Sequence, residues 1–125
     1  MKKMKRLPDT EFDVMKAVWV LEQPITASKV LQQLSDTHKL VVQSVITLLM
    51  RLVERGFLRT EKNANERTYY PLVTRDDYLK FETGNFIKYY CEDSITNLIK
   101  TLNDNKELTA KDIEELYEWV KERKE

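Results

Sequence analysis

The chain has 125 residues, of which 42% are hydrophobic and 34% charged, and its formal net charge is zero. This length fits one domain or two small ones. No apolar run approaches the roughly 18 residues that a membrane-spanning helix needs. The basic stretch at residues 1–10 has no apolar segment and is not expected to act as a signal peptide. We therefore expect a cytoplasmic protein without membrane insertion.

Residues that carry chemistry are scarce. The lone cysteine, Cys91, excludes an internal disulfide and a multi-cysteine metal site. The lone histidine, His38, has no second ligand near it in sequence and is interpreted as a surface or turn residue. The sequence has no Gly-rich phosphate loop, nucleophile motif or histidine cluster. We expect neither an enzyme nor a metal or other cofactor.

The zero net charge hides an asymmetry between the two parts of the chain. Residues 1–72 carry 12 Lys and Arg against 8 Asp and Glu, whereas residues 73–125 carry 9 against 13. A basic first part joined to an acidic second part fits a DNA-binding region followed by one that does not touch DNA.

Apolar spacing predicts a first helix that begins at Asp9 or its neighbour and ends at Gln23-Pro24. Ile25 is predicted to form a short strand. Thr26 then caps a second helix that runs from Ala27 to about Asp36.

The helix that follows is the most informative element, because its two faces differ in character. One face repeats Val45, Leu48, Leu49 and Leu52 at the period of a buried stripe. The opposite face carries Gln43, Ser44, Thr47 and Arg51, side chains that can bond base edges or phosphates. A solvated helix face is the alternative interpretation of these four residues.

A hairpin is predicted after Gly56, which is expected to end this helix in a left-handed conformation. Two strands, residues 57–61 and 66–72, are joined by a polar turn. Three cations on or near the hairpin tip are candidate phosphate contacts: Arg59, Lys62 and Arg67. They could instead protect an edge strand from pairing.

The order helix, strand, helix, helix, strand, strand is that of a winged helix. The sequence therefore predicts a mainly α protein with a small β-wing, in which residues 1–73 form a winged helix-turn-helix DNA-binding domain. Residues 74–125 are predicted to form three helices that mediate dimerisation, because so short a segment rarely buries enough surface alone. Their candidate dimer contacts are Tyr78, Phe81, Phe86, Tyr90, Leu98, Leu102, Ile113, Leu116 and Val120.

Three stretches resemble the penicillinase repressor family of bacterial transcription regulators, the BlaI/MecI/CopY group. They are residues 11–15 with Trp19, residues 44–56, and residues 67–71. The resemblance covers nearly the whole chain. It implies a homodimeric repressor that binds an inverted-repeat operator in double-stranded DNA. By position, Gln43, Ser44 and Thr47 would read bases, whereas Arg51 and Arg67 would hold the backbone.

The resemblance leaves the inducing signal open. Copper-responsive members end in two Cys-x-Cys motifs, which this chain lacks. Members that respond to β-lactams are cut by a membrane sensor protease, commonly at an Asn-Phe bond, but the comparable position here is Thr101-Leu102. The β-lactamase-type branch, which controls β-lactam resistance genes, is the best fit.

Two alternatives remain. A winged helix can serve as a protein-interaction adaptor, in which case DNA sequence would not matter. A copper- or small-molecule-responsive regulator of the same fold is the other; a small-molecule version would need a pocket among aromatic residues 78–90.

Overall fold

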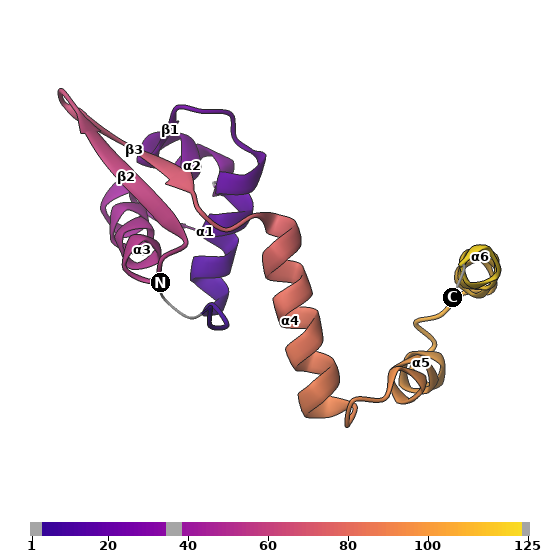
Figure 1. Cartoon of the computed structure of the whole chain (residues 1–125). Helices are drawn as coiled ribbons and strands as arrows, with labels where there is room; N and C mark the ends of the chain where they lie inside the picture. The colour runs from indigo at the N-terminus through magenta and orange to yellow at the C-terminus, as the bar shows by residue number, and fades with distance from the viewer. Residues whose placement is uncertain (1–3, 35–38, 124–125) are drawn as a thin grey trace. The chain divides into compact units, whose positions relative to one another are not determined.

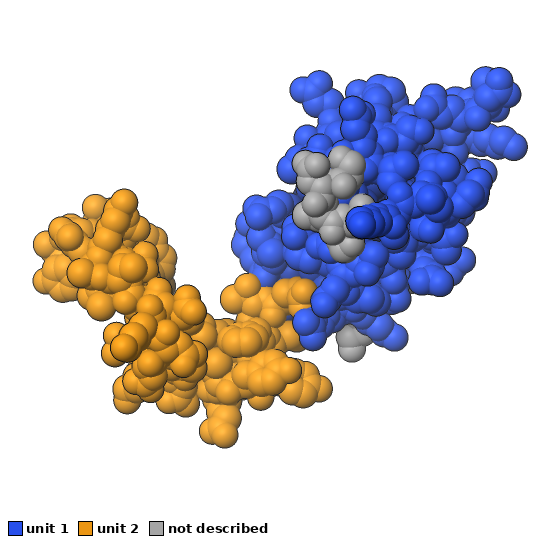
Figure 2. Space-filling model, turned by 180° about the vertical axis from the view of Figure 1, so that it is seen from behind, with its two compact units in different colours: residues 1–81 blue, residues 82–125 orange. Residues whose placement is uncertain are grey.

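The computed structural model describes residues 4–34 and 39–123. The chain forms two compact units, residues 1–81 and residues 82–125, coloured separately in Figure 2. The domains expected from the sequence, residues 1–73 and 74–125, divide the chain slightly earlier than these units. Each unit is described on its own below.

Three helices and a small sheet make up most of the first unit (Figure 1). The helices are α1 (Asp9–Val20), α2 (Ala27–Leu34) and α3 (Val42–Glu54). Helix α1 begins after Pro8, a residue suited to a helix start because it fixes its own φ angle. The predicted end of the second helix near Asp36, and the turn with His38, lie outside the described residues.

Gly56 follows the end of α3 in the predicted left-handed conformation, with a φ angle of 86°. The amide of Gly56 donates to the Val53 carbonyl at 3.0 Å, and the amide of Phe57 donates to the Leu52 carbonyl at 2.9 Å. This pair of bonds is the Schellman arrangement, which satisfies carbonyl groups that the last helical turn leaves open. Phe57 is buried and directs the chain into the sheet.

The sheet contains β1 (Ile25–Thr26), β2 (Leu58–Asn63) and β3 (Glu66–Pro71), in the order β1-β3-β2 with antiparallel pairing. The short strand predicted at Ile25 is therefore confirmed. Because β1 reaches only Thr68 and Tyr69 of β3, the outer end of the β2–β3 hairpin is two-stranded and projects as a wing (Figure 1).

Tyr78 completes the core of the first unit, although the sequence assigned it to a dimer contact. It lies in α4 (Arg75–Tyr90), is fully buried, and accepts a hydrogen bond of 2.7 Å from the Leu7 amide. Its ring contacts those of Phe12, Trp19, Phe57 and Phe81. A side chain enclosed in this way offers no surface to a second copy, and Phe81 is partly buried beside it.

The second unit contains the end of α4, α5 (Ile95–Asp104) and α6 (Ala110–Glu122). Ser94 caps α5, and Thr109 caps α6, where the Thr109 amide also donates to the Asp112 carboxylate. No residue of α5 or α6 is buried. Among the described residues of this unit only Cys91 is buried, so one copy forms almost no core here.

Candidate nucleic-acid interface

Helix α3 separates its apolar and polar residues as the sequence predicted. Its buried residues are Val45, Leu48, Leu49 and Leu52, which pack into the core of the first unit. On the other side Gln43, Thr47 and Arg51 are exposed, and Ser44 is half-buried. The structure thus brings the four predicted DNA-binding residues of this helix onto one accessible face.

Thr47 is oriented by its own helix. Its hydroxyl donates to the Gln43 carbonyl at 3.1 Å. Because that bond uses the hydroxyl hydrogen, the lone pairs of the oxygen remain available to accept a bond. The methyl group gives the same side chain an apolar surface.

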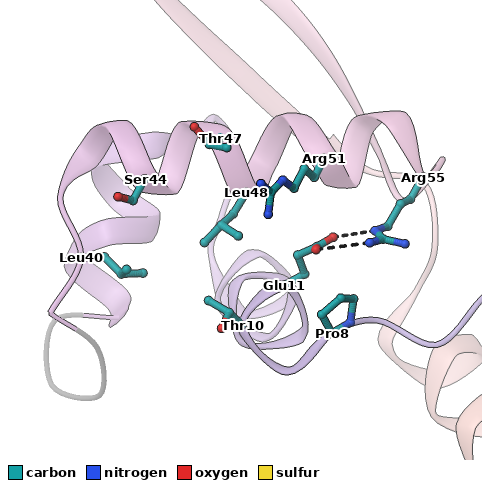
Figure 3. Close-up of a pocket in the computed structure, with 9 residues that line it drawn as sticks. All are labelled: Pro8, Thr10, Glu11, Leu40, Ser44, Thr47, Leu48, Arg51 and Arg55. Atoms are coloured by element: carbon teal, nitrogen blue, oxygen red, sulfur yellow. Dashed lines mark hydrogen bonds and ion pairs between the residues drawn. The ribbon is translucent and has the colours of Figure 1, made fainter.

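A cleft of about 620 Å³ lies between α3 and the start of α1 (Figure 3). Ser44, Thr47 and Arg51 lie along α3, and Pro8 and Thr10 face them from the start of α1. The full lining is Pro8, Thr10, Glu11, Leu40, Ser44, Thr47, Leu48, Arg51 and Arg55. Hydroxyl and guanidinium groups therefore line this cleft together with the apolar side chains of Pro8, Leu40 and Leu48.

An ion pair joins the two walls of this cleft. Arg55 donates from Nε to Glu11 Oε1 at 2.6 Å and from Nη2 to Glu11 Oε2 at 3.4 Å (Figure 3). The side chain of Glu11 is 4% exposed and that of Arg55 is 37% exposed. The pair ties the first turn of α1 to the residue that caps the end of α3.

On the wing, Arg59 is engaged by its neighbours rather than projecting freely. Its Nη1 lies 2.8 Å from Glu61 Oε1, and its guanidinium lies 4.0 Å from the centre of the Tyr70 ring. The strand register pairs Arg59 with Tyr70 directly, and Glu61 shares a face with Arg59 by strand alternation. Because residues two apart in a strand share a face, the sequence could have predicted the pairing of Arg59 with Glu61.

Lys62 and Arg67 face each other across the hairpin next to the turn, and both are exposed. Arg67 makes one weak bond, from Nη1 to Thr60 Oγ1 at 3.4 Å. Of the three cations predicted on the wing, these two are the more accessible to a phosphate.

Thr68, a buried residue of β3, is bonded by two side chains of β2. The Thr60 hydroxyl donates to the Thr68 carbonyl at 2.8 Å, and Asn63 Nδ2 donates to Thr68 Oγ1 at 3.1 Å. Tyr69 is also buried, which raises the pKa of its phenol, whereas the nearby charge of Arg67 lowers that pKa. With the net pKa raised, Tyr69 is neutral at physiological pH.

Most other predicted dimer residues lie in the second unit with part of their surface open. Phe86, Tyr90, Ile113, Leu116 and Val120 are exposed by 40 to 75%, and Leu98 and Leu102 are half-buried.

The described residues offer neither a metal cluster nor a membrane span. Residues 4–34 and 39–123 contain no group of three His, Cys, Asp or Glu side chains placed to hold a metal ion. Over the same residues, no helix combines the length and apolarity required to cross a bilayer.

Fold and site together define a winged-helix protein with a helical second unit. The model of the penicillinase repressor family matches residues 7–122, and the chain belongs to that family, which consists of transcriptional repressors rather than enzymes. The penicillinase repressor of Bacillus licheniformis is 27% identical over 124 residues, covering 99% of this chain and 96% of the relative. The methicillin resistance regulatory protein MecI of Mammaliicoccus sciuri is 25% identical over 115 residues, covering 91% and 92%.

A solved structure supports the fold of the first unit. The DNA binding domain of the repressor BlaI is 32% identical, with a TM-score of 0.53, and the match covers 62% of this chain and 94% of that domain. The predicted winged-helix fold and the predicted family are thus confirmed.

Proposed function

We propose that this protein is a transcriptional repressor that binds an inverted-repeat operator in double-stranded DNA as a homodimer. The observation that carries the proposal is the exposed face of α3, where Gln43, Thr47 and Arg51 stand beside Ser44. No acidic residue precedes Glu54 in this helix, so its DNA-facing part would not repel phosphates. The family and the solved DNA binding domain support the same function.

Each side chain on this face suits a particular contact. The Gln43 amide can bond adenine through two atoms, and Arg51 can bond guanine or hold a phosphate. Thr47 donates to the Gln43 carbonyl, so its oxygen is suited to accept a bond from an adenine or cytosine amino group. Ser44 can serve as donor or acceptor. These four residues form the proposed base-reading and backbone contacts of the helix.

The wing supplies the proposed second contact with the phosphate backbone. Arg67 and Lys62 lie exposed at its tip, where a cation can approach a phosphate. Arg59 is held by Glu61 and Tyr70, so we assign it chiefly to the shape of the wing. The sequence-based hypothesis counted Arg59 among the candidate phosphate contacts, so this assignment departs from it at Arg59.

Salt dependence of DNA binding separates these roles. The slope of log affinity against log salt is negative, and each lost phosphate contact reduces its magnitude by about 0.9. Arg67→Met should show that reduction with the stability of the fold unchanged. Arg59→Met, the matched control, should leave the slope within about 0.3 of wild type. A full reduction for Arg59→Met would contradict its assignment to wing shape.

Dimerisation through the second unit is proposed because that unit lacks a core of its own. Helices α5 and α6 bury no residue in one copy, yet they expose Ile113, Leu116 and Val120 at helical spacing. A second copy can cover this apolar stripe. A two-fold dimer would also present two α3 helices to two half-sites of a palindrome.

The regulated genes follow from the relatives by analogy. Their names make β-lactam resistance genes the first candidates. The membrane sensor protease implied by the family resemblance is the proposed partner that relieves repression. A repressor of this kind acts in the cytoplasm, where bacterial DNA lies.

Footprinting on the DNA upstream of the gene for this protein, with random DNA as competitor, tests the function. Protection of an inverted repeat with half-sites about 10 base pairs apart is expected. Thr47→Ala should weaken binding to the repeat by about 1–3 kcal/mol and leave binding to random DNA nearly unchanged. Salt-sensitive binding with no preferred sequence would overturn the proposal and favour a protein-binding role.

A further inference from the structure

Helix α3, the proposed recognition helix, begins with apolar residues that are exposed. Val41 precedes the first turn of α3 and is 65% exposed, and Val42 opens the helix at 36%. Ile46, one turn further on, is half-buried but is not part of the core cluster formed by the described residues. Isolated exposed apolar residues are ordinary on protein surfaces, but here they cluster at one end of one helix.

Helix capping does not explain the valine at position 41. Val41 is the N-cap of α3, has extended backbone angles, and its side chain makes no capping hydrogen bond. Ser, Thr, Asp or Asn is strongly preferred at an N-cap, because a side-chain oxygen satisfies an amide of the first turn. A β-branched residue also follows at Val42. Positions where such local rules fail without a gain in packing are often functional.

The apolar residues line up beside the proposed base-reading residues. Val42 and Ile46 are four residues apart and therefore share a face of the helix. Gln43 and Thr47 form the neighbouring column, joined by the bond from the Thr47 hydroxyl to the Gln43 carbonyl at 3.1 Å. The two columns begin at the end of the helix that enters the major groove in helix-turn-helix proteins.

The major groove presents one exposed apolar group, the C5-methyl of thymine. Phosphates, sugars and the remaining base-edge atoms are polar and would lose water against a valine without gaining a hydrogen bond. Resting on the proposed function, we infer that Val42 and Ile46 contact thymine methyl groups and select thymine at fixed positions of each half-site. Gln43 and Thr47 would read the polar edges next to them.

Replacement of single thymine methyl groups in a selected binding site tests the inference. The full-length protein selects preferred duplexes from random DNA, and each thymine of the selected half-site is then replaced singly by deoxyuridine, which lacks only the methyl group. Wild-type protein should bind about four-fold more weakly at one or two of these positions, the loss expected for one buried methyl group. Equal binding at every position would overturn the inference.

Substitutions then connect the methyl group to the side chains. Val42→Ala and Ile46→Ala should weaken binding to thymine DNA by a similar factor and cause no further loss on the matching deoxyuridine DNA. Two controls are Gln43→Ala, expected to lose the same factor on both DNAs, and Val20→Ala, a more exposed valine in α1 expected to lose nothing. Circular dichroism and thermal unfolding verify that each variant folds like wild type.

The outcomes separate this inference from the function on which it rests. If the selection yields a preferred sequence but the losses from the side-chain substitution and from the missing methyl group add up, the thymine contact is overturned. The repressor proposal then still stands. Selection that yields no preferred sequence overturns both.

Discussion

Replacing Arg55 by Met should destabilise the first unit more than replacing Glu11 by Gln. The two partners are bonded at 2.6 Å and 3.4 Å, but their surroundings differ. Without Glu11 the guanidinium, 37% exposed, can turn toward water; without Arg55 the carboxylate, 4% exposed, stays buried with no cation. An unpaired buried charge is the larger penalty.

The exposures set the expected size of each effect. Breaking a buried ion pair by removing one partner destabilises by about 3–5 kcal/mol, and the partial exposure of Arg55 places Arg55→Met near about 3 kcal/mol. Glu11→Gln retains one acceptor oxygen and should lower the free energy of unfolding by about 1 kcal/mol. The double variant contains no buried charge, so its loss should be about 1–2 kcal/mol. Adding Glu11→Gln to Arg55→Met is thus expected to restore stability.

Urea unfolding with tryptophan fluorescence measures these differences. The two tryptophans lie in different units: Trp19 donates to the Val73 carbonyl at 2.9 Å in the first, and Trp119 belongs to α6 in the second. A Trp119→Phe background therefore reports the first unit alone. Trp119 is 57% exposed, so its replacement leaves the core intact.

Lys16→Met provides the control for loss of a surface ion pair. Lys16 and Asp13 lie 3.3 Å apart with side chains 53% and 27% exposed, and losing their pairing should change stability by less than about 0.5 kcal/mol. Equal losses for Glu11→Gln and Arg55→Met, or a double variant less stable than Arg55→Met alone, would refute the argument from burial.

Three further predictions concern other parts of the chain. Ala64→Gly should stabilise the wing by about 0.5 kcal/mol in thermal unfolding, because Ala64 has a φ angle of 52° that glycine adopts without strain; a loss would contradict this. A fragment of residues 1–81 should show a cooperative unfolding transition. A fragment of residues 1–73, which lacks the buried Tyr78, should have a free energy of unfolding lower by about 3–5 kcal/mol and should bind 1-anilinonaphthalene-8-sulfonate. Equal stability of the two fragments would show that Tyr78 is dispensable. Leu116→Asp should shift the protein to monomer in sedimentation at micromolar concentration, since a charge would enter the proposed apolar interface; an unchanged dimer would place the interface elsewhere.

Features decided by neighbouring residues could be predicted from the sequence. The buried stripe of α3 follows from apolar spacing, and the left-handed turn at Gly56 follows from the one residue type that adopts it easily. The cap of α6 is equally local, because Asp112, the partner of Thr109, lies three residues away. In each case the deciding chemistry lies within a few residues.

Pairings between distant residues could not be predicted in this way. Glu11 lies in the first turn of α1, where a carboxylate suits the helix dipole, so local reasoning already accounts for its position. Its partner Arg55 lies 44 residues later, and no local pattern connects the two. Tyr78 accepts from the Leu7 amide across 71 residues, and its helix has the same cap and aromatic neighbours whichever unit it joins.

The proposed interface is where local rules of stability are broken. Val41 caps α3 poorly, and Ala64 holds a left-handed conformation at the wing tip, yet better residues exist for both positions. The core beneath follows the rules: Val45, Leu49 and Leu52 are fully buried. If folding alone had shaped these positions, the wing tip would carry Gly at position 64 and the start of α3 would carry Ser or Asp at position 41. Their absence at two separate points on one proposed DNA-binding surface is better explained by selection for contact with a partner than by folding.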